Sequence, residues 1–157
     1  IIHARKGILK GLSPRQNRNI PPLNYQKVYS IKDDFPELEI IINGGIKGIS
    51  EVKKHLNYVD GVMLGRAAYD DPFMLSNIDS EIYSNSKINV SRKDLLSEYL
   101  DYVDLMTKKG YDPKIMLKHV FGLKKGEKDA KRFRVKVAEI MNSPSLVENR
   151  DALLSMV

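Results

Sequence analysis

The first half of the chain alternates short β-branched runs with segments that repeat apolar residues at helical spacing. Helices are predicted over residues 25–34 and from Ser50, as N-cap, through Val52 and Leu56. A further short helix is predicted over 66–75. The order of strand, helix and strand is typical of parallel βαβ units. The three runs that predict strands are Ile1-Ile2, Ile40-Ile41-Ile42 and Val62-Met63-Leu64.

The second half of the chain contains helical stripes and no convincing strand. Ser91 and Asp94 have the spacing of a capping box at the start of a helix. Gly110 has the position of the residue that ends the same helix. Asp112 and Ser143 each precede a proline, which is the arrangement of an N-cap before a first helical turn. These signals predict a small antiparallel bundle with helices over 92–109, 113–122, 127–141 and 144–156.

A polar stretch over 84–91 separates these regions, so we expect one domain over 1–84 and a second over 91–157. Three parallel strands would leave two unpaired edges, and parallel sheets are rarely stable when narrow and uncovered. The expected fold class is therefore α/β plus all-α: the C-terminal half of a (β/α)8 TIM barrel followed by a small helical bundle. Because Ile1 already lies in a strand pattern, we expect the chain to be a fragment of a longer protein.

Two glycine turns follow the second and third predicted strands, "NGG" at 43–45 and "GR" at 65–66. The loops after the last two strands of such barrels commonly hold a phosphate. Backbone N–H groups at a glycine turn can approach phosphate oxygens, and the Arg66 guanidinium can add to them. Plain turn chemistry explains either pair alone. Their separation by one βα unit favours a phosphate site.

Composition narrows the class of protein further. The chain has 157 residues, of which 42% are hydrophobic, and this is sufficient for a globular core. It contains no apolar run of about 18 residues and no secretory leader pattern, so we expect a cytoplasmic protein. The absence of cysteine excludes a disulfide frame and a thiolate metal site from these residues, and we expect no metal.

The positive charge is concentrated in one segment. Residues 108–136 carry eleven Lys and Arg against three Asp and Glu, a net charge of +8, whereas the whole chain carries +6. A focused positive field is typical of proteins that bind polyanions. A solvated lysine-rich surface is the alternative interpretation.

Four segments of the chain read "HARK" at 3–6, "GLSPRQNRNIPPLNY" at 11–25, "INGGI" at 42–46 and "DGVMLGRAAYDDP" at 60–72. Together they closely resemble the C-terminal half of the tRNA-dihydrouridine synthase A family. The likeness is specific through about residue 75. Beyond it, "HVFGLKKGEKDAKRFR" at 119–134 is similar to the closing basic motif of the family, but looser.

Members of that family are flavoenzymes that use FMN and NADPH to reduce the C5–C6 double bond of uridines in the tRNA D-loop. The resemblance implies that tRNA and the N-terminal half of the barrel are the partners of this chain. The FMN-binding residues that it implies are His3, Asn43, Gly44, Gly45, Gly65 and Arg66. The tRNA-binding residues that it implies are Arg15, Gln16 and Asn19 in the loop, and Lys131, Arg132 and Arg134 in the basic helix.

The family's catalytic cysteine belongs to the N-terminal half, so no catalytic residue is expected in this chain, and alone it is expected to be inactive. A non-catalytic tRNA-binding module is therefore the alternative to an enzyme part. Another FMN-dependent barrel enzyme acting on small molecules is a third hypothesis, which the basic segment and the added helices disfavour.

Several other residues receive structural interpretations. Tyr99, Tyr102 and Met106 fit the core stripe of the bundle better than a base-stacking platform. His55 and His119 are expected as surface or helix residues.

Overall fold

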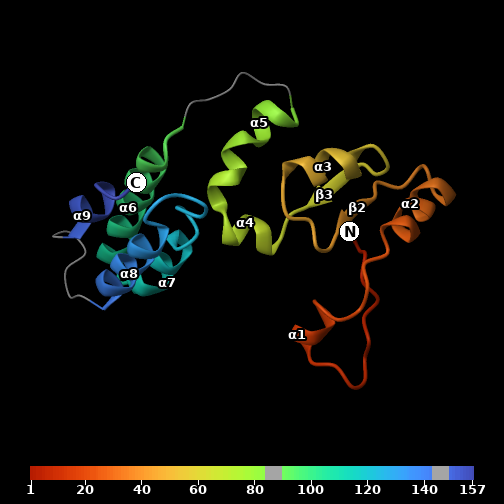
Figure 1. Ribbon diagram of the computed structural model, residues 1–157, viewed down its shortest axis with the longest axis horizontal. Helices are drawn as coiled ribbons and strands as arrows, with labels where there is room; N and C mark the ends of the chain where they lie inside the picture. The colour runs from red at the N-terminus through yellow and green to blue at the C-terminus, as the bar shows by residue number, and fades with distance from the viewer. Residues whose placement is uncertain (84–89, 143–148) are drawn as a thin grey trace. The chain divides into compact units, whose positions relative to one another are not determined.

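The structure is a computed structural model that describes residues 1–83, 90–142 and 149–157. The chain forms two compact units, Ile1–Ala67 and Ala68–Val157 (Figure 1). The first contains the sheet, and the second is helical. In the parts of the chain that the structure describes, no helix is long and apolar enough to cross a membrane.

A parallel sheet with strand order β1-β2-β3 organises the first unit. Its strands are β1 (Ile2–His3), β2 (Ile41–Asn43) and β3 (Gly61–Met63), so the three predicted strands are confirmed. The described residues supply no fourth strand, which leaves β1 and β3 as edges. A narrow parallel sheet of this kind is consistent with part of a barrel.

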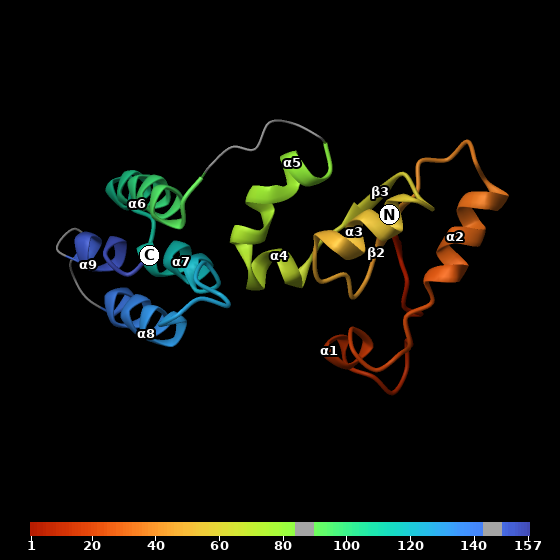
Figure 2. The ribbon, with the colours of Figure 1, turned by 45° about the horizontal axis from the view of Figure 1, so that its top comes forward.

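Helices α2 (Tyr25–Asp34) and α3 (Ile49–Leu56) follow β1 and β2, and α2 has its predicted bounds. The predicted N-cap of α3 is wrong, because Gly48 and not Ser50 occupies that position. The helix begins earlier since the Glu51 carboxylate, in its first turn, accepts a 2.7 Å hydrogen bond from the Lys47 N–H. Short helix α1 (Pro14–Asn17) lies in a long loop that extends away from the sheet in both ribbon views (Figure 1 and Figure 2).

The Asp60 carboxylate makes contacts at the amino-terminal end of the sheet. Asp60 accepts a 2.8 Å hydrogen bond from the N–H of Ile40, the residue before β2, and forms a 2.9 Å ion pair with Lys32 of α2. The backbone hydrogen bond from Ile40 first, and Lys32 second, lower the pKa of Asp60 below its usual value. These contacts join the segments that precede β2 and β3 to helix α2.

The predicted helix over 66–75 is divided at Asp71 into α4 (Arg66–Asp70) and the 3-10 helix η1 (Pro72–Asn77), because Pro72 begins a new turn. Helix α5 (Ile78–Glu81) follows. The Arg92 guanidinium then lies 3.9 Å from the centre of the Phe73 ring and donates to the Leu123 carbonyl at 2.9 Å. These contacts join η1 to the helices that follow.

The remaining helices are α6 (Arg92–Lys108), α7 (Pro113–Leu117) with the 3-10 helix η2 (Lys118–Val120), α8 (Ala130–Met141) and α9 (Arg150–Leu154). The capping box of Ser91 and Asp94 is confirmed. Helix α8 begins three residues later than predicted, at Ala130. The predicted Ser143-Pro144 start of the last helix lies outside the described residues.

Helices α6, α7, α8 and α9 pack around one apolar core (Figure 2). Its fully buried side chains include Leu96, Leu100, Leu117, Phe133, Val137 and Leu153. Tyr99 packs against this core and donates a 3.1 Å hydrogen bond to the Met116 carbonyl.

The interpretation of Tyr102 as a core residue is wrong, because its side chain is 48% exposed. At 3.6 residues per turn, Tyr102 lies roughly 120° from the centre of the buried stripe of α6.

Residues 68–81 belong to the compact helical unit by their contacts. The predicted division into a cofactor-binding domain over 1–84 and a tRNA-binding domain over 91–157 stays a prediction.

Candidate functional site

The carboxyl ends of the three strands lie in register at one edge of the sheet. His3 pairs with Asn43, and Asn43 pairs with Met63. The loops that follow the strands therefore start at the same edge, which is where open and closed parallel α/β sheets bind ligands. The predicted cofactor residues lie in or directly after these positions.

The turn after β2 requires glycine twice. Gly44 has φ 120° and Gly45 has φ 73°, and residues other than glycine rarely adopt either value. A Cβ atom at Gly44 would lie 3.0 Å from His3 Cε1, and one at Gly45 would lie 2.5 Å from Leu23 Cδ1. The structure thus brings His3 and the turn together, as an FMN site formed by both would require.

Among the residues that the structure describes, the backbone N–H groups in this turn have no acceptor. Gly44 and Gly45 donate no hydrogen bond to another described residue, whereas the Asn43 carbonyl accepts one from Ala4 at 2.7 Å. His3 is exposed, and its Nδ1 accepts a 3.0 Å hydrogen bond from the Arg5 N–H, which leaves Nε2 as its other polar atom. The turn and the imidazole together offer donors of the kind that bind anionic oxygens.

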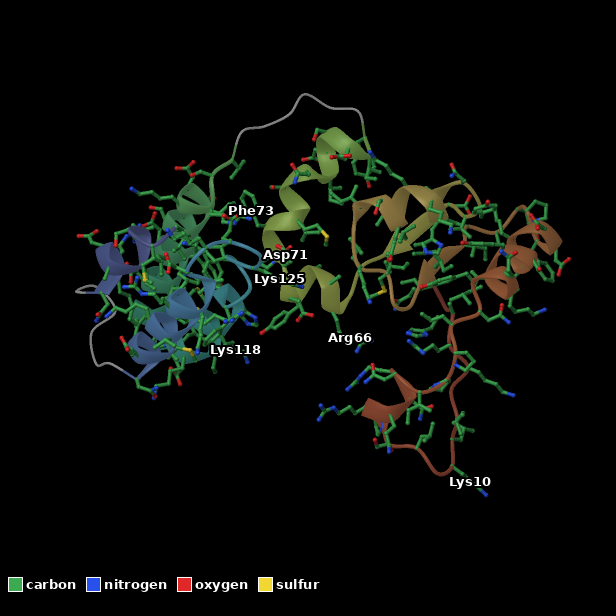
Figure 3. All side chains as sticks on the ribbon, in the orientation of Figure 1. Lys10, Arg66, Asp71, Phe73, Lys118 and Lys125 are labelled. Carbon is green, nitrogen blue, oxygen red and sulfur yellow. The ribbon has the colours of Figure 1, made fainter. Side chains whose placement is uncertain are left out.

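Arg66 extends from the start of α4 beside an exposed Gly65 (Figure 3). Its guanidinium donates to Asn19 Oδ1 at 2.8 Å and to the Arg18 carbonyl at 3.3 Å. A Cβ atom at Gly65 would meet nothing within 4 Å, so the space beside it is open. A predicted cofactor residue, Arg66, is therefore bonded to a predicted tRNA-binding residue, Asn19.

The loop that carries Asn19 is internally ordered. Ser13 and Gln16 form a complete capping box at the start of α1, in which Gln16 Oε1 accepts from the Ser13 N–H at 2.8 Å. Arg5 donates to the carbonyls of Asn19 and Pro21. Gln16, a predicted tRNA-binding residue, thus has a structural partner for its side-chain oxygen, while Arg15 is exposed.

Helix α8 presents the basic residues predicted to bind tRNA. Lys131, Arg132 and Arg134 are exposed, whereas Phe133 between them is fully buried. The side chain of Arg132 forms a 3.8 Å ion pair with Asp129, with both groups largely exposed. Buried Phe133 therefore fixes the two arginines on either side of the apolar stripe.

Sequence reasoning missed an aromatic cluster behind the glycine turn. The Tyr25 hydroxyl donates to the Gly44 carbonyl at 2.8 Å, and the Tyr25 ring lies edge-on to His55 with centroids 4.5 Å apart. His55 is only 4% exposed and its Nδ1 lies 2.7 Å from the Tyr29 hydroxyl, so the surface interpretation of His55 is wrong. Burial lowers the pKa of His55 and raises that of Tyr29.

The only sequence signal for this cluster is the helical phase of α2 and α3. Tyr25 and Tyr29 are four residues apart, and so are Glu51 and His55. That spacing predicts that the two residues of each pair lie on the same face of their helix. It does not predict which helix packs against that face. Among the residues that the structure describes, no group of His, Asp or Glu side chains could hold a metal ion.

A parallel β/α unit with a glycine turn and an arginine at its strand ends defines a ligand-binding portion of an α/β protein. The sequence model for "Dihydrouridine synthase (Dus)" matches residues 1–156. The chain belongs to this family of TIM-barrel enzymes.

Curated relatives agree with the family assignment. The chain is 42% identical over 139 residues to the tRNA-dihydrouridine(20/20a) synthase of Haemophilus ducreyi, covering 88% of this chain and 43% of that protein. It is 44% identical over 133 residues to the protein of the same name from Pseudomonas putida, covering 85% and 40%. The match to the Yersinia pestis protein covers 98% of this chain and 46% of that protein at 39% identity. The chain thus spans less than half the length of these relatives.

Proposed function

We propose that this chain supplies the C-terminal part of an FMN- and NADPH-dependent tRNA-dihydrouridine synthase, which reduces uridine to 5,6-dihydrouridine in the tRNA D-loop. The names of the relatives support positions 20 and 20a as the target. The proposed compartment is the cytoplasm. The observation that carries the proposal is the glycine turn at Gly44 and Gly45, which lies against His3 and has two N–H groups for which the described part of the chain offers no acceptor.

The residues present fit the phosphate of FMN. The N–H groups of the turn would donate hydrogen bonds to phosphate oxygens, the space beside Gly65 is open, and Arg66 supplies a planar cation. Asn43 and His3 complete the proposed set, with His3 Nε2 as an added polar contact. Bound FMN, reduced by NADPH, would supply the hydride that saturates the uridine double bond.

The proton for the second carbon must come from outside these 157 residues, because the chain contains no cysteine. What this chain contributes is binding and orientation. The domain over 1–84 would hold the cofactor, and the domain over 91–157 would hold tRNA. Strands from an N-terminal half would pair with the edges of the sheet at β1 and β3.

Two separate surfaces would contact tRNA in this proposal. The first is the ordered loop with Arg15, Gln16 and Asn19, and the second is helix α8 with Lys131, Arg132 and Arg134. Since Arg66 is bonded to Asn19 and Arg18, the first surface is linked directly to the cofactor site.

The absence of cysteine favours one second candidate, a non-catalytic tRNA-binding module. Visible absorbance separates the two. The purified chain is measured alone and mixed with the N-terminal portion of the Haemophilus ducreyi relative that precedes the matched region. A flavin spectrum that co-purifies with either sample, and is lost in Gly45→Ala, is expected for the enzyme part. A colourless chain that binds tRNA in both samples would support the module instead.

A further inference from the structure

One side chain, that of Tyr25, forms a hydrogen bond with the glycine turn. Tyr25, the first residue of α2, donates its hydroxyl hydrogen to the Gly44 carbonyl over 2.8 Å. The same hydroxyl oxygen lies 3.3 Å from where a Cβ atom of Gly45 would be. Tyr25 thus contacts the turn at the peptide group that joins its two glycines.

This contact sets the direction of a donor. In a trans peptide, the carbonyl of one residue and the N–H of the next point in opposite directions. With the Gly44 carbonyl held toward Tyr25, the Gly45 N–H points away from Tyr25. Glycine has access to many backbone conformations, so without the hydrogen bond this peptide could rotate.

The Tyr25 ring, which carries the hydroxyl, packs against buried neighbours. The Tyr25 ring packs edge-on against His55, whose Nδ1 is 2.7 Å from the Tyr29 hydroxyl. Tyr29 is buried and stacks on Tyr58 with centroids 4.4 Å apart. Partial burial raises the pKa of Tyr25, which keeps its hydroxyl protonated as a donor.

We propose that Tyr25 is a positioning residue for the cofactor: its hydroxyl fixes the Gly44–Gly45 peptide so that the Gly45 N–H faces the phosphate of FMN. This inference rests on the proposed function. Tyr25 would thus affect the affinity for the ligand without contacting the ligand itself.

The test compares FMN with riboflavin, which has the same ring system without the phosphate. Tyr25→Phe keeps the ring and removes only the hydroxyl. Tyr29→Phe is the matched control, because it removes a hydroxyl from the same cluster without touching the turn. Affinities are measured by quenching of flavin fluorescence, with the chain alone and with the N-terminal portion of the Haemophilus ducreyi relative.

Loss of one positioning hydrogen bond should lower the preference for FMN over riboflavin by about 3- to 10-fold in Tyr25→Phe. The preference should be unchanged in Tyr29→Phe. Equal weakening of both ligands in Tyr25→Phe, or an equal fall of the preference in both variants, would overturn the proposed role. A wild-type protein with no preference for FMN would instead overturn the phosphate site itself, and with it the proposed function.

Discussion

Replacing Arg132 and Arg134 with alanine should weaken tRNA binding through electrostatics alone. Both side chains are exposed, and the intervening Phe133 carries the packing of α8, so the double variant should keep its fold. The ion pair of Arg132 with Asp129 is exposed and 3.8 Å long, and such pairs contribute little to stability. Arg132 is therefore free to exchange this partner for a phosphate.

The magnitude follows from counterion release. Each phosphate contact contributes about 0.7 to 0.9 to the slope of log K against log salt, so two contacts contribute about 1.4 to 1.8. At about 0.15 M salt, their loss lowers the affinity by about 14- to 30-fold.

Fluorescence anisotropy with an unmodified tRNA transcript, measured from about 50 to 300 mM KCl, gives both the slope and the affinity. Lys27→Ala/Lys54→Ala is the matched control, since it removes two exposed positive charges from α2 and α3. An unchanged slope in the arginine variant, or an equal change in the lysine control, would refute the assignment of α8 to tRNA binding.

Two further predictions concern stability. Gly122→Ala should lower the free energy of unfolding by about 1 to 3 kcal/mol, because the new Cβ atom would lie 2.5 Å from the Asp70 carbonyl oxygen. Gly7→Ala, with nothing within 4 Å, should change it by less than about 0.5 kcal/mol in the same urea titration, and equal effects would contradict this packing. Since burial lowers the pKa of His55 below 6.5, the folded state favours neutral imidazole, and stability should fall as the pH drops below about 6.5. Urea titrations across this pH range should show a smaller fall in the free energy of unfolding in His55→Gln, and a fall of wild-type size in exposed His119→Gln. A fall of wild-type size in His55→Gln would contradict the assignment of this pH dependence to His55.

Local signals predicted the elements well where each signal is complete within a few residues. The apolar runs over 40–42 and 62–64 predicted strands β2 and β3, and Ser91 with Asp94 predicted the start of α6. The start of α3 was missed because two signals compete there. Ser50 is a good cap by residue type, but the bond from Lys47 to Glu51 favours an earlier start.

Contacts between elements were beyond local patterns. Tyr25 and Gly44 are 19 residues apart, and their hydrogen bond depends on how α2 packs behind β2. His55 was expected as a surface or helix residue, since the sequence shows no partner for it, and its burial follows from contact with Tyr29 of α2. The hydrogen bond between Arg66 and Asn19 likewise joins the start of α4 to the loop after α1, and neither sequence motif shows that these two segments lie together.

The dihydrouridine content of cellular tRNA tests the proposed function most directly. Positions 20 and 20a of the D-loop are mapped in tRNA from cells that lack the gene encoding this chain, and again after the gene is restored. Loss of dihydrouridine at these positions and its return on complementation are the predicted results. Dihydrouridine at wild-type levels in the deleted strain would contradict a role of this chain in the synthase.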